Sequence, residues 1–254
     1  MSDEYDLDSG PDPTTIATAD SEVVDAEDPV YAVGIGPGNL EYLTPRGERA
    51  IREADVVVGF TTVVDFVADC TDAELFTCGY KDELDTLEAF AEEVAAGKRG
   101  TAVLMGDPNH SGYQFVGKVK RAVDRPVRVI PGISSIQVAA SRARTPLEET
   151  AFVTLHRSGD IEPELSSLRA VVGRQNLLVL PRPYDWMPGD IAADLLGAGA
   201  DPDLEALVLE RLTHEDESVT KCSLGELAEF AGGDTEDDTP FSDLSVLAVR
   251  AWNQ

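Results

Sequence analysis

Residues 30–39 read VYAVGIGPGN and carry the strongest indication of the fold class. Its first seven residues form a short apolar run, rich in β-branched side chains, that ends in Gly, which is typical of a buried parallel strand. Thr44 and Pro45 then predict a helix to about Glu53, because Thr is a good N-cap and Pro fits the first helical position. A strand, a glycine-rich turn and a helix in this order predict the start of an α/β sheet.

The alternation of strand and helix continues as far as residue 144. Because such alternation builds parallel sheets, we expect the first domain to have a parallel or mostly parallel sheet. Further strands are expected at 55–60 (DVVVGF), 101–106 (TAVLMG) and 126–130 (PVRVI), and further helices at 62–69, 83–97, 112–123 and 134–144.

The pattern restarts after Thr145-Pro146 with more strands for each helix, which predicts a second α/β domain with a mixed sheet. We expect an N-terminal α/β domain over residues 29–147 and a C-terminal α/β domain over 148–254. In the second domain strands are expected at 151–155, 176–181, 204–212, 218–222 and 243–251, helices at 163–173, 189–197 and 224–230, and a surface loop at 231–240.

The whole chain is strongly acidic, with a net charge of −28 and a pI near 4.2. Such a polyanion is a poor partner for nucleic acid or an anionic membrane surface. Residues 1–28 contain ten acidic residues and no Lys or Arg, and we expect them to form a disordered tail. The other acids are spread along the chain, and Lys is scarce, with five residues against fifteen Arg. This pattern favours adaptation to high salt, which screens self-repulsion; a local acidic patch for cations or a basic partner is the alternative.

Nothing in the sequence directs the chain into or across a membrane. It has no basic start followed by an apolar stretch and no apolar run of about 18 residues, so we expect neither a secretory signal nor a membrane span. Cys70, Cys78 and Cys222 are odd in number and lack a CxxC pair, which indicates reduced thiols in a cytoplasmic protein. The three His (110, 156 and 214) lack metal-ligand spacing, and no metal is expected.

Three of the apolar strands end in a turn that contains Gly and Pro. The turns read GIGPGN (34–39), MGDP (105–108) and PGISS (131–135). Glycine lets the backbone approach a ligand closely, and α/β proteins bind ligands at this edge of the sheet. Each turn alone has a structural alternative: a tight turn for the first, a cap or a cation site for the Asp107 carboxylate, and helix capping for Ser134 or Ser135. Together the three turns are expected to line one crevice.

A dinucleotide site competes for the first turn, because a GxGxxG motif also follows a strand. Asn39 stands in place of the third Gly, and DVVVGF is followed by Thr61 and Thr62 rather than by an acid for a ribose hydroxyl. Both features argue against a dinucleotide.

In order along the chain, GIGPGNLEYLTPRGERAIREADVVVG (34–59), LMGDPNHSGY (104–113) and VIPGISSIQVAASR (129–142) resemble the tetrapyrrole methyltransferases of the cobalamin pathway. The resemblance runs from about Val30 to the C-terminus. Within that superfamily the sequence looks most like the carbon-5 methyltransferases of cobalt-precorrin-7, and PGISSIQ with a strand ending in TLH (154–156) is its most specific part. Together with the acidity, the resemblance suggests a version from a salt-loving archaeon.

The resemblance implies a tetrapyrrole methylase fold, in which S-adenosylmethionine and the tetrapyrrole lie in an active-site cleft between two α/β domains, and a homodimer. The start of NLLVLP (176–181), which ends in Pro181, and the segment 210–212, which ends in Leu212, would hold the adenine largely through backbone groups. Arg46, Arg142, Arg144 and Arg157 are candidates for the substrate carboxylates. The implied cofactor-binding residues are Pro37, Met105, Gly106, Asp107, Ser134, Ser135, Pro181 and Leu212, and the implied substrate-binding residues are Gly36, Gly38, His110, His156 and Arg157.

The implied reaction is one methyl transfer to carbon 5 of cobalt-precorrin-7, in cobalamin biosynthesis. No decarboxylation is expected, because in bifunctional relatives that step belongs to a further domain and this chain stops at Gln254. No catalytic residue is assigned, since the protein has mainly to align the reacting atoms in a dry cleft. Lys81, near a Lys used by related enzymes acting on uroporphyrinogen, is given no role. The alternatives are a sibling enzyme acting at another ring carbon, a diphthine synthase, and a non-enzymatic nucleotide-binding module.

Overall fold

The computed structural model describes residues 28–110, 112–157, 159–232 and 238–252. The predicted acidic tail lies outside the described residues except for Asp28, whose carboxylate pairs with Arg125 at 2.7 Å. The chain divides into two compact units, with the boundary between Ser134 and Ser135. The first unit ends at Ser134 and the second begins at Ser135, and each is described by itself.

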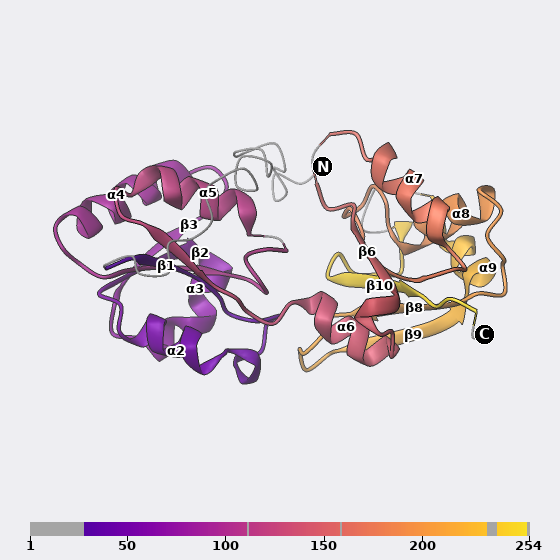
Figure 1. The fold of residues 1–254 in the computed structure, drawn as a ribbon, viewed down its shortest axis with the longest axis horizontal. Coiled ribbons are helices and arrows are strands. Elements are labelled where there is room, and N and C mark those ends of the chain that lie inside the picture. The colour runs from indigo at the N-terminus through magenta and orange to yellow at the C-terminus, as the bar shows by residue number, and fades with distance from the viewer. Residues whose placement is uncertain (1–27, 111, 158, 233–237, 253–254) are drawn as a thin grey trace. The chain divides into compact units, whose positions relative to one another are not determined.

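The first unit is a five-stranded parallel sheet with helices on both faces (Figure 1). Its strand order is β3-β2-β4-β1-β5. The strands are β1 (Val30–Gly34), β2 (Val56–Phe60), β3 (Glu74–Cys78), β4 (Gly100–Leu104) and β5 (Val127–Ile130), and the helices are α2 (Pro45–Arg52), α3 (Thr61–Val67), α4 (Glu83–Ala95) and α5 (Tyr113–Ala122).

Alternation of side chains along the strands builds the two layers. Val56 and Val58 of β2 pack with helices α4 and α5, whereas Val57 between them packs with α2 and α3. Side chains of a strand point alternately to the two faces, so a continuous apolar run fills both layers. The apolar runs therefore correctly predicted four of the five strands of this sheet, β1, β2, β4 and β5.

Strand β3 is the element that sequence reasoning missed. It reads ELFTC, lies at the edge of the sheet, and has three exposed residues out of five. Without a continuous apolar run it lacks the signal that identified the buried strands.

The second unit has a mixed five-stranded sheet in the order β6-β7-β10-β8-β9. Strands β6 and β7 are parallel, and the other neighbouring pairs are antiparallel. The strands are β6 (Thr150–Thr154), β7 (Asn176–Leu180), β8 (Glu205–Glu210), β9 (Ser218–Ser223) and β10 (Ser245–Val249), and the helices are α6 (Ser135–Ala143), α7 (Glu162–Val171), α8 (Pro188–Gly197) and α9 (Leu224–Leu227). One parallel and one mixed sheet confirm the predicted fold class.

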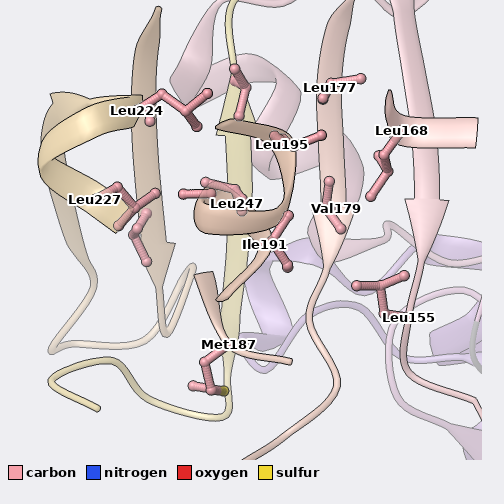
Figure 2. Packing of buried hydrophobic residues seen from close by; sticks show 14 of the residues in the cluster. Leu155, Leu168, Leu177, Val179, Met187, Ile191, Leu195, Leu224, Leu227 and Leu247 are labelled. Atoms are coloured by element: carbon pink, nitrogen blue, oxygen red, sulfur yellow. The ribbon is translucent and has the colours of Figure 1, made fainter. Parts of the chain in front are cut away.

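The core of the second unit is a leucine-rich layer between the sheet and the helices α7, α8 and α9. Figure 2 shows Leu177, Val179 and Leu247 of the sheet facing Leu195 and Ile191 of α8, with Leu224 and Leu227 of α9 beside them. All seven side chains are fully buried. At about 1.5–3 kcal/mol for each buried aliphatic side chain, this layer is a main source of the unit's stability.

Helix α6 belongs to the second unit, whereas the sequence placed it in the first domain. It packs against β7 and β10, and Figure 1 shows it on the side of β10 away from α7 and α8. The contacts therefore put the boundary at residue 134 rather than at 147. The strand–helix rhythm runs on through α6, so it gives no sign that this helix covers the next sheet.

Candidate functional site

Three glycine-containing turns meet at the carboxyl edge of the first sheet. The strands that carry them, β4, β1 and β5, are neighbours in the sheet. Gly106 donates its N–H to the carbonyl of Gly36 at 2.7 Å, and Gly36 donates to the carbonyl of Gly106 at 3.3 Å. The structure thus joins the first two turns by a backbone bridge.

Direct packing of backbone on backbone explains why glycine occupies these turns. A Cβ on Gly132 would lie 2.2 Å from the Gly106 carbonyl oxygen, and a Cβ on Gly34 would lie 2.7 Å from the Gly132 nitrogen. Any side chain at either position would force the turns apart.

Gly106 has a different environment. Its φ is +66°, and a Cβ built on it would meet nothing nearer than the Ser134 Cα at 4.0 Å. The bare backbone here leaves open space beside a buried Ser134. A ligand could therefore approach this main chain without meeting a side chain.

Asp107 locks the second and third turns together. Its side chain is 7% exposed, and its two carboxylate oxygens accept the N–H groups of Asn109 at 2.8 Å and Gly132 at 3.0 Å. Its carbonyl accepts the N–H of His110 at 3.0 Å. Of the roles that the sequence allowed for this carboxylate, the structure shows the cap of the turns.

The other predicted residues of the first unit lie in or next to the same turns. Pro37 and Gly36 are buried, Gly38 and His110 are half-buried, and Gly38 has a φ of +115°. The half-buried Met105 packs against the apolar layer under β1, β2 and β4.

The predicted residues of the second unit also share one sheet edge. The directions of the strands bring the carboxyl ends of β6, β7 and β8 to the same edge as the amino ends of β9 and β10. His156 and Arg157 follow β6, Pro181 follows β7, and Leu212 follows β8. Ser135 begins helix α6.

A pocket of about 410 Å³ lies at this edge. Glu210 is central to it, because its carboxylate accepts the N–H of Ser242 at 2.7 Å and the hydroxyl of Ser218 at 3.3 Å. The volume of the pocket falls in the range of about 300–1,000 Å³ that small-molecule sites occupy. The lining residues are Tyr184, Glu210, Arg211, Asp216, Ser218, Thr239, Pro240, Phe241, Ser242 and Asp243.

Sequence reasoning missed most of this lining. Residues 239–243 follow an acidic, glycine-containing stretch that reads as a plain surface loop. The order and direction of the strands could have revealed it. FSDLS (241–245) leads into β10, and β10 begins at the edge of the sheet where the strands before His156 and Leu212 end.

His156 and two of the candidate arginines have protein partners. His156 is exposed at the surface, but the protein around its imidazole removes part of the ring's hydration, and this desolvation lowers the pKa of His156. The charge of Asp243 opposes the shift, and the charge of Arg182 adds to it. Arg157 pairs with Glu164, and Arg142 pairs with a carboxylate of the segment after β8. Arg46 and Arg144, the other two candidates for the substrate carboxylates, are exposed.

Near β3, the first unit contains a second buried polar cluster. Lys118 of α5 pairs with Glu83 of α4, and their side chains are only 9% and 4% exposed. Burial, with the nearby Glu83, raises the pKa of the Cys78 thiol to about 12. No group of His, Cys, Asp and Glu side chains in the described part of the chain is arranged to hold a metal ion, and no helix there is long and apolar enough to cross a membrane.

Comparison with known sequences gives matches over nearly the whole described chain. The family model for tetrapyrrole (corrin/porphyrin) methylases matches residues 29–228. A probable cobalt-precorrin-7 C(5)-methyltransferase of Methanocaldococcus jannaschii is 32% identical over 222 residues, which cover 87% of this chain and 97% of that protein. A cobalt-precorrin-4 C(11)-methyltransferase of the same organism is 24% identical over 214 residues, covering 79% and 80%.

Solved structures share the architecture. The precorrin-6Y methylase CbiE of Archaeoglobus fulgidus is 22% identical with a TM-score of 0.61, covering 89% of this chain and 100% of that one. A uroporphyrin-III C-methyltransferase of Thermus thermophilus, solved with S-adenyl homocysteine, is 24% identical with a TM-score of 0.65, covering 87% and 92%. At these identities the likeness shows the fold alone.

Proposed function

The chain belongs to the tetrapyrrole (corrin/porphyrin) methylase family, and we propose that within it the protein methylates carbon 5 of cobalt-precorrin-7 with S-adenosylmethionine as the methyl donor. Support for carbon 5 comes from the relative that matches over 97% of its length at 32% identity. The relative named for carbon 11 matches at 24% identity over a smaller share of both chains, so a sibling activity is the second candidate.

The geometry of the first turns suits this cofactor. We propose that the main chain at Gly106 and the neighbouring Ser134 receive its methionine and ribose part, since the space beside Gly106 holds no side chain. In the second unit, the pocket around Glu210 has a volume of about 410 Å³, and it lies at the sheet edge where Pro181 follows β7 and Leu212 follows β8. Both sets of residues lie at strand ends, where α/β proteins bind nucleotide-like ligands.

The proposed role of the chain in catalysis is alignment. S-adenosylmethionine supplies, when bound, a methyl group on a sulfonium sulfur that is already electrophilic. The protein has to hold that group and the electron-rich ring carbon in line and exclude water, and such positioning can lower the barrier by about 7–11 kcal/mol. The rigid backbone bridge between Gly36 and Gly106 and the Asp107 cap suit this task, because they fix main-chain atoms rather than flexible side chains.

Two glycines with positive φ provide a matched test of the cofactor site. Gly106→Ala places a methyl group in the proposed cofactor space, and Gly97→Ala imposes a similar backbone strain at a φ of +102° after helix α4. We expect titration calorimetry to show that Gly106→Ala weakens S-adenosylmethionine binding by about tenfold or more, while Gly97→Ala leaves it unchanged. Equal binding by both variants would remove Gly106 from the site.

The site of methylation is tested directly with carbon-13 methyl-labelled cofactor. Purified protein is incubated with cobalt-precorrin-7 or with cobalt-precorrin-4, and the products are analysed by mass spectrometry and carbon NMR. We expect a gain of one methyl group at carbon 5 of the former, with no loss of carbon dioxide. Label at another ring carbon, or turnover of cobalt-precorrin-4 alone, would favour the sibling activity.

We also propose that the enzyme acts as a homodimer in a salt-rich cytoplasm. The support is the resemblance described above and the spread of 48 acidic residues against 20 basic ones. Sedimentation analysis in molar KCl checks the dimer, and a single species with the mass of one chain would contradict it.

A further inference from the structure

The turn that carries Leu212 has an unusual backbone. It links β8 to β9, and the two residues that flank Leu212 both have positive φ, 47° at Arg211 and 73° at Thr213. Thr is β-branched, and such residues rarely adopt this conformation. Thr213 is also buried, at 9% exposure. A local interaction must therefore hold the turn in place.

The N–H of Arg211 donates to the carbonyl of Leu244 at 2.9 Å, and Glu217 provides the interaction at Thr213. One carboxylate oxygen, Oε2, accepts the N–H of Thr213 at 2.8 Å. The other, Oε1, accepts from Nε of Arg142 at 2.6 Å, and Nη2 of Arg142 lies 3.3 Å from Oε2. The pairing with Arg142 holds the pKa of Glu217 below its usual range, so the carboxylate is charged at neutral pH and is a strong acceptor.

Arg142 connects this turn to another part of the proposed site. It lies in the last turn of helix α6, which begins at Ser135. Glu217 is thus bound on one side to the turn of Leu212 and on the other to the helix that starts with a proposed cofactor residue. Both belong to the second unit.

We infer that Glu217, oriented by Arg142, is a positioning residue that fixes the main chain of Leu212 for the adenosine part of the cofactor. The inference rests on the proposed function. Recognition through backbone groups requires their directions to be set before binding, since a peptide group that rotates no longer offers its donor or acceptor to the ring. The peptide groups of Leu212 lie between two residues of positive φ. They keep a single direction as long as Glu217 holds Thr213 in its conformation.

The test uses four variants of the full chain in molar KCl. Glu217→Ala removes both interactions, Glu217→Gln keeps an acceptor for the N–H of Thr213, and Glu217→Ala with Thr213→Gly lets residue 213 keep its φ without the carboxylate. Glu215→Ala, at an exposed acid of the same loop, is the control for charge. Dissociation constants come from calorimetry, KM and kcat from turnover, and amide exchange across residues 211–217 is followed without cofactor.

For Glu217→Ala we expect dissociation constant and KM for S-adenosylmethionine to rise about tenfold, with kcat at saturation little changed and faster amide exchange in the loop. The affinity of Glu217→Gln for S-adenosylmethionine should lie between those of Glu217→Ala and the wild type. The double variant with Thr213→Gly should recover most of the affinity, and Glu215→Ala should bind as the wild type does. If Glu217→Ala does not fold, Glu217→Gln and the double variant Glu217→Ala with Thr213→Gly are compared with the wild type instead.

The failures are distinguishable. A wild-type protein that does not bind S-adenosylmethionine refutes the proposed function and this inference with it. A wild type that binds, with Glu217→Ala binding equally well, overturns the inference alone. A loss of melting temperature in Glu217→Ala without any change in the dissociation constant would show a purely structural role.

Discussion

Replacement of Asp107 by Ala tests how the turns of the proposed cofactor site are held together. The carboxylate accepts two backbone N–H groups, from Asn109 and Gly132, and it is almost completely buried. As an implied cofactor-binding residue alone, Asp107 would be expected to weaken cofactor binding when it is replaced by Ala and to leave the fold intact. The structure changes that expectation, because the variant removes a link between two turns as well as a possible ligand contact.

The magnitude follows from the surroundings of the two donors. Gly132 is buried, so its N–H would lose its partner without access to water, which costs about 1–3 kcal/mol. Asn109 is exposed, so water can replace the carboxylate at its N–H, and the loss there is about 1 kcal/mol. We therefore expect Asp107→Ala to lower the free energy of unfolding by about 2–4 kcal/mol. Asp107→Asn keeps one acceptor oxygen and should lose roughly half as much.

Urea unfolding in molar KCl measures the effect. A loss of this size lowers the urea midpoint by about 1–2 M, for a slope of about 2 kcal/mol per molar urea. Asp65→Ala, at an exposed carboxylate of helix α3, is the matched control and should leave the midpoint nearly unchanged. The reasoning fails if Asp107→Ala unfolds at the wild-type midpoint, because the two hydrogen bonds would then contribute nothing that water cannot replace.

Three further outcomes are expected. Lys118→Met leaves Glu83 buried without its partner and should lower the free energy of unfolding in urea by about 3–5 kcal/mol. Lys120→Met, at an exposed position of the same helix, should change it little, and equal urea midpoints for the two variants would contradict the cost of the buried charge. The melting temperature should rise from dilute buffer to molar KCl, because the residues after the tail carry a charge of about −18 and the Debye length shortens from about 10 Å at 0.1 M to about 3 Å at 1 M; a melting temperature independent of salt would refute the reading of the acidity. The pairing with Arg142 lowers the pKa of Glu217, so the contribution of this carboxylate to stability is complete above the ordinary pKa of 4.5 and is lost as the pH falls through the lowered pKa. The difference in unfolding free energy between wild type and Glu217→Gln should therefore disappear in acid, and a difference that persists there would contradict the role of the charged carboxylate.

Elements that rely on local signals were predictable from the sequence. The continuous apolar runs of β1, β2 and β4 predicted buried strands, and each lies within the expected bounds to one or two residues. Thr44 and Pro45 predicted the start of α2, and the structure shows the Thr44 hydroxyl accepting the N–H of Gly47 at 3.1 Å. The turns after β1, β4 and β5 were expected to lie together because parallel strands end at one edge of the sheet.

Features that depend on tertiary packing were not predictable in this way. The exposed edge strand β3 forms by pairing with β2, and its sequence carries no apolar run. The assignment of α6 to the second unit depends on its contacts with β7 and β10, which lie far along the chain. The role of Glu217 needs a partner 75 residues away, and among 48 acidic residues no local pattern distinguishes this one.

The two units use a carboxylate for the same physical task. In the first, Asp107 accepts the N–H of Gly132 and fixes one turn against another; in the second, Glu217 accepts the N–H of Thr213 and fixes a turn against helix α6. Both residues are among the less exposed acids of the described residues, whose other carboxylates mostly face solvent. Salt screens exposed charges far more than buried, hydrogen-bonded ones. The stabilising effect of salt should therefore come from the exposed acids, while the geometry of the two turns should depend on Asp107 and Glu217 at any salt concentration in which the chain is folded.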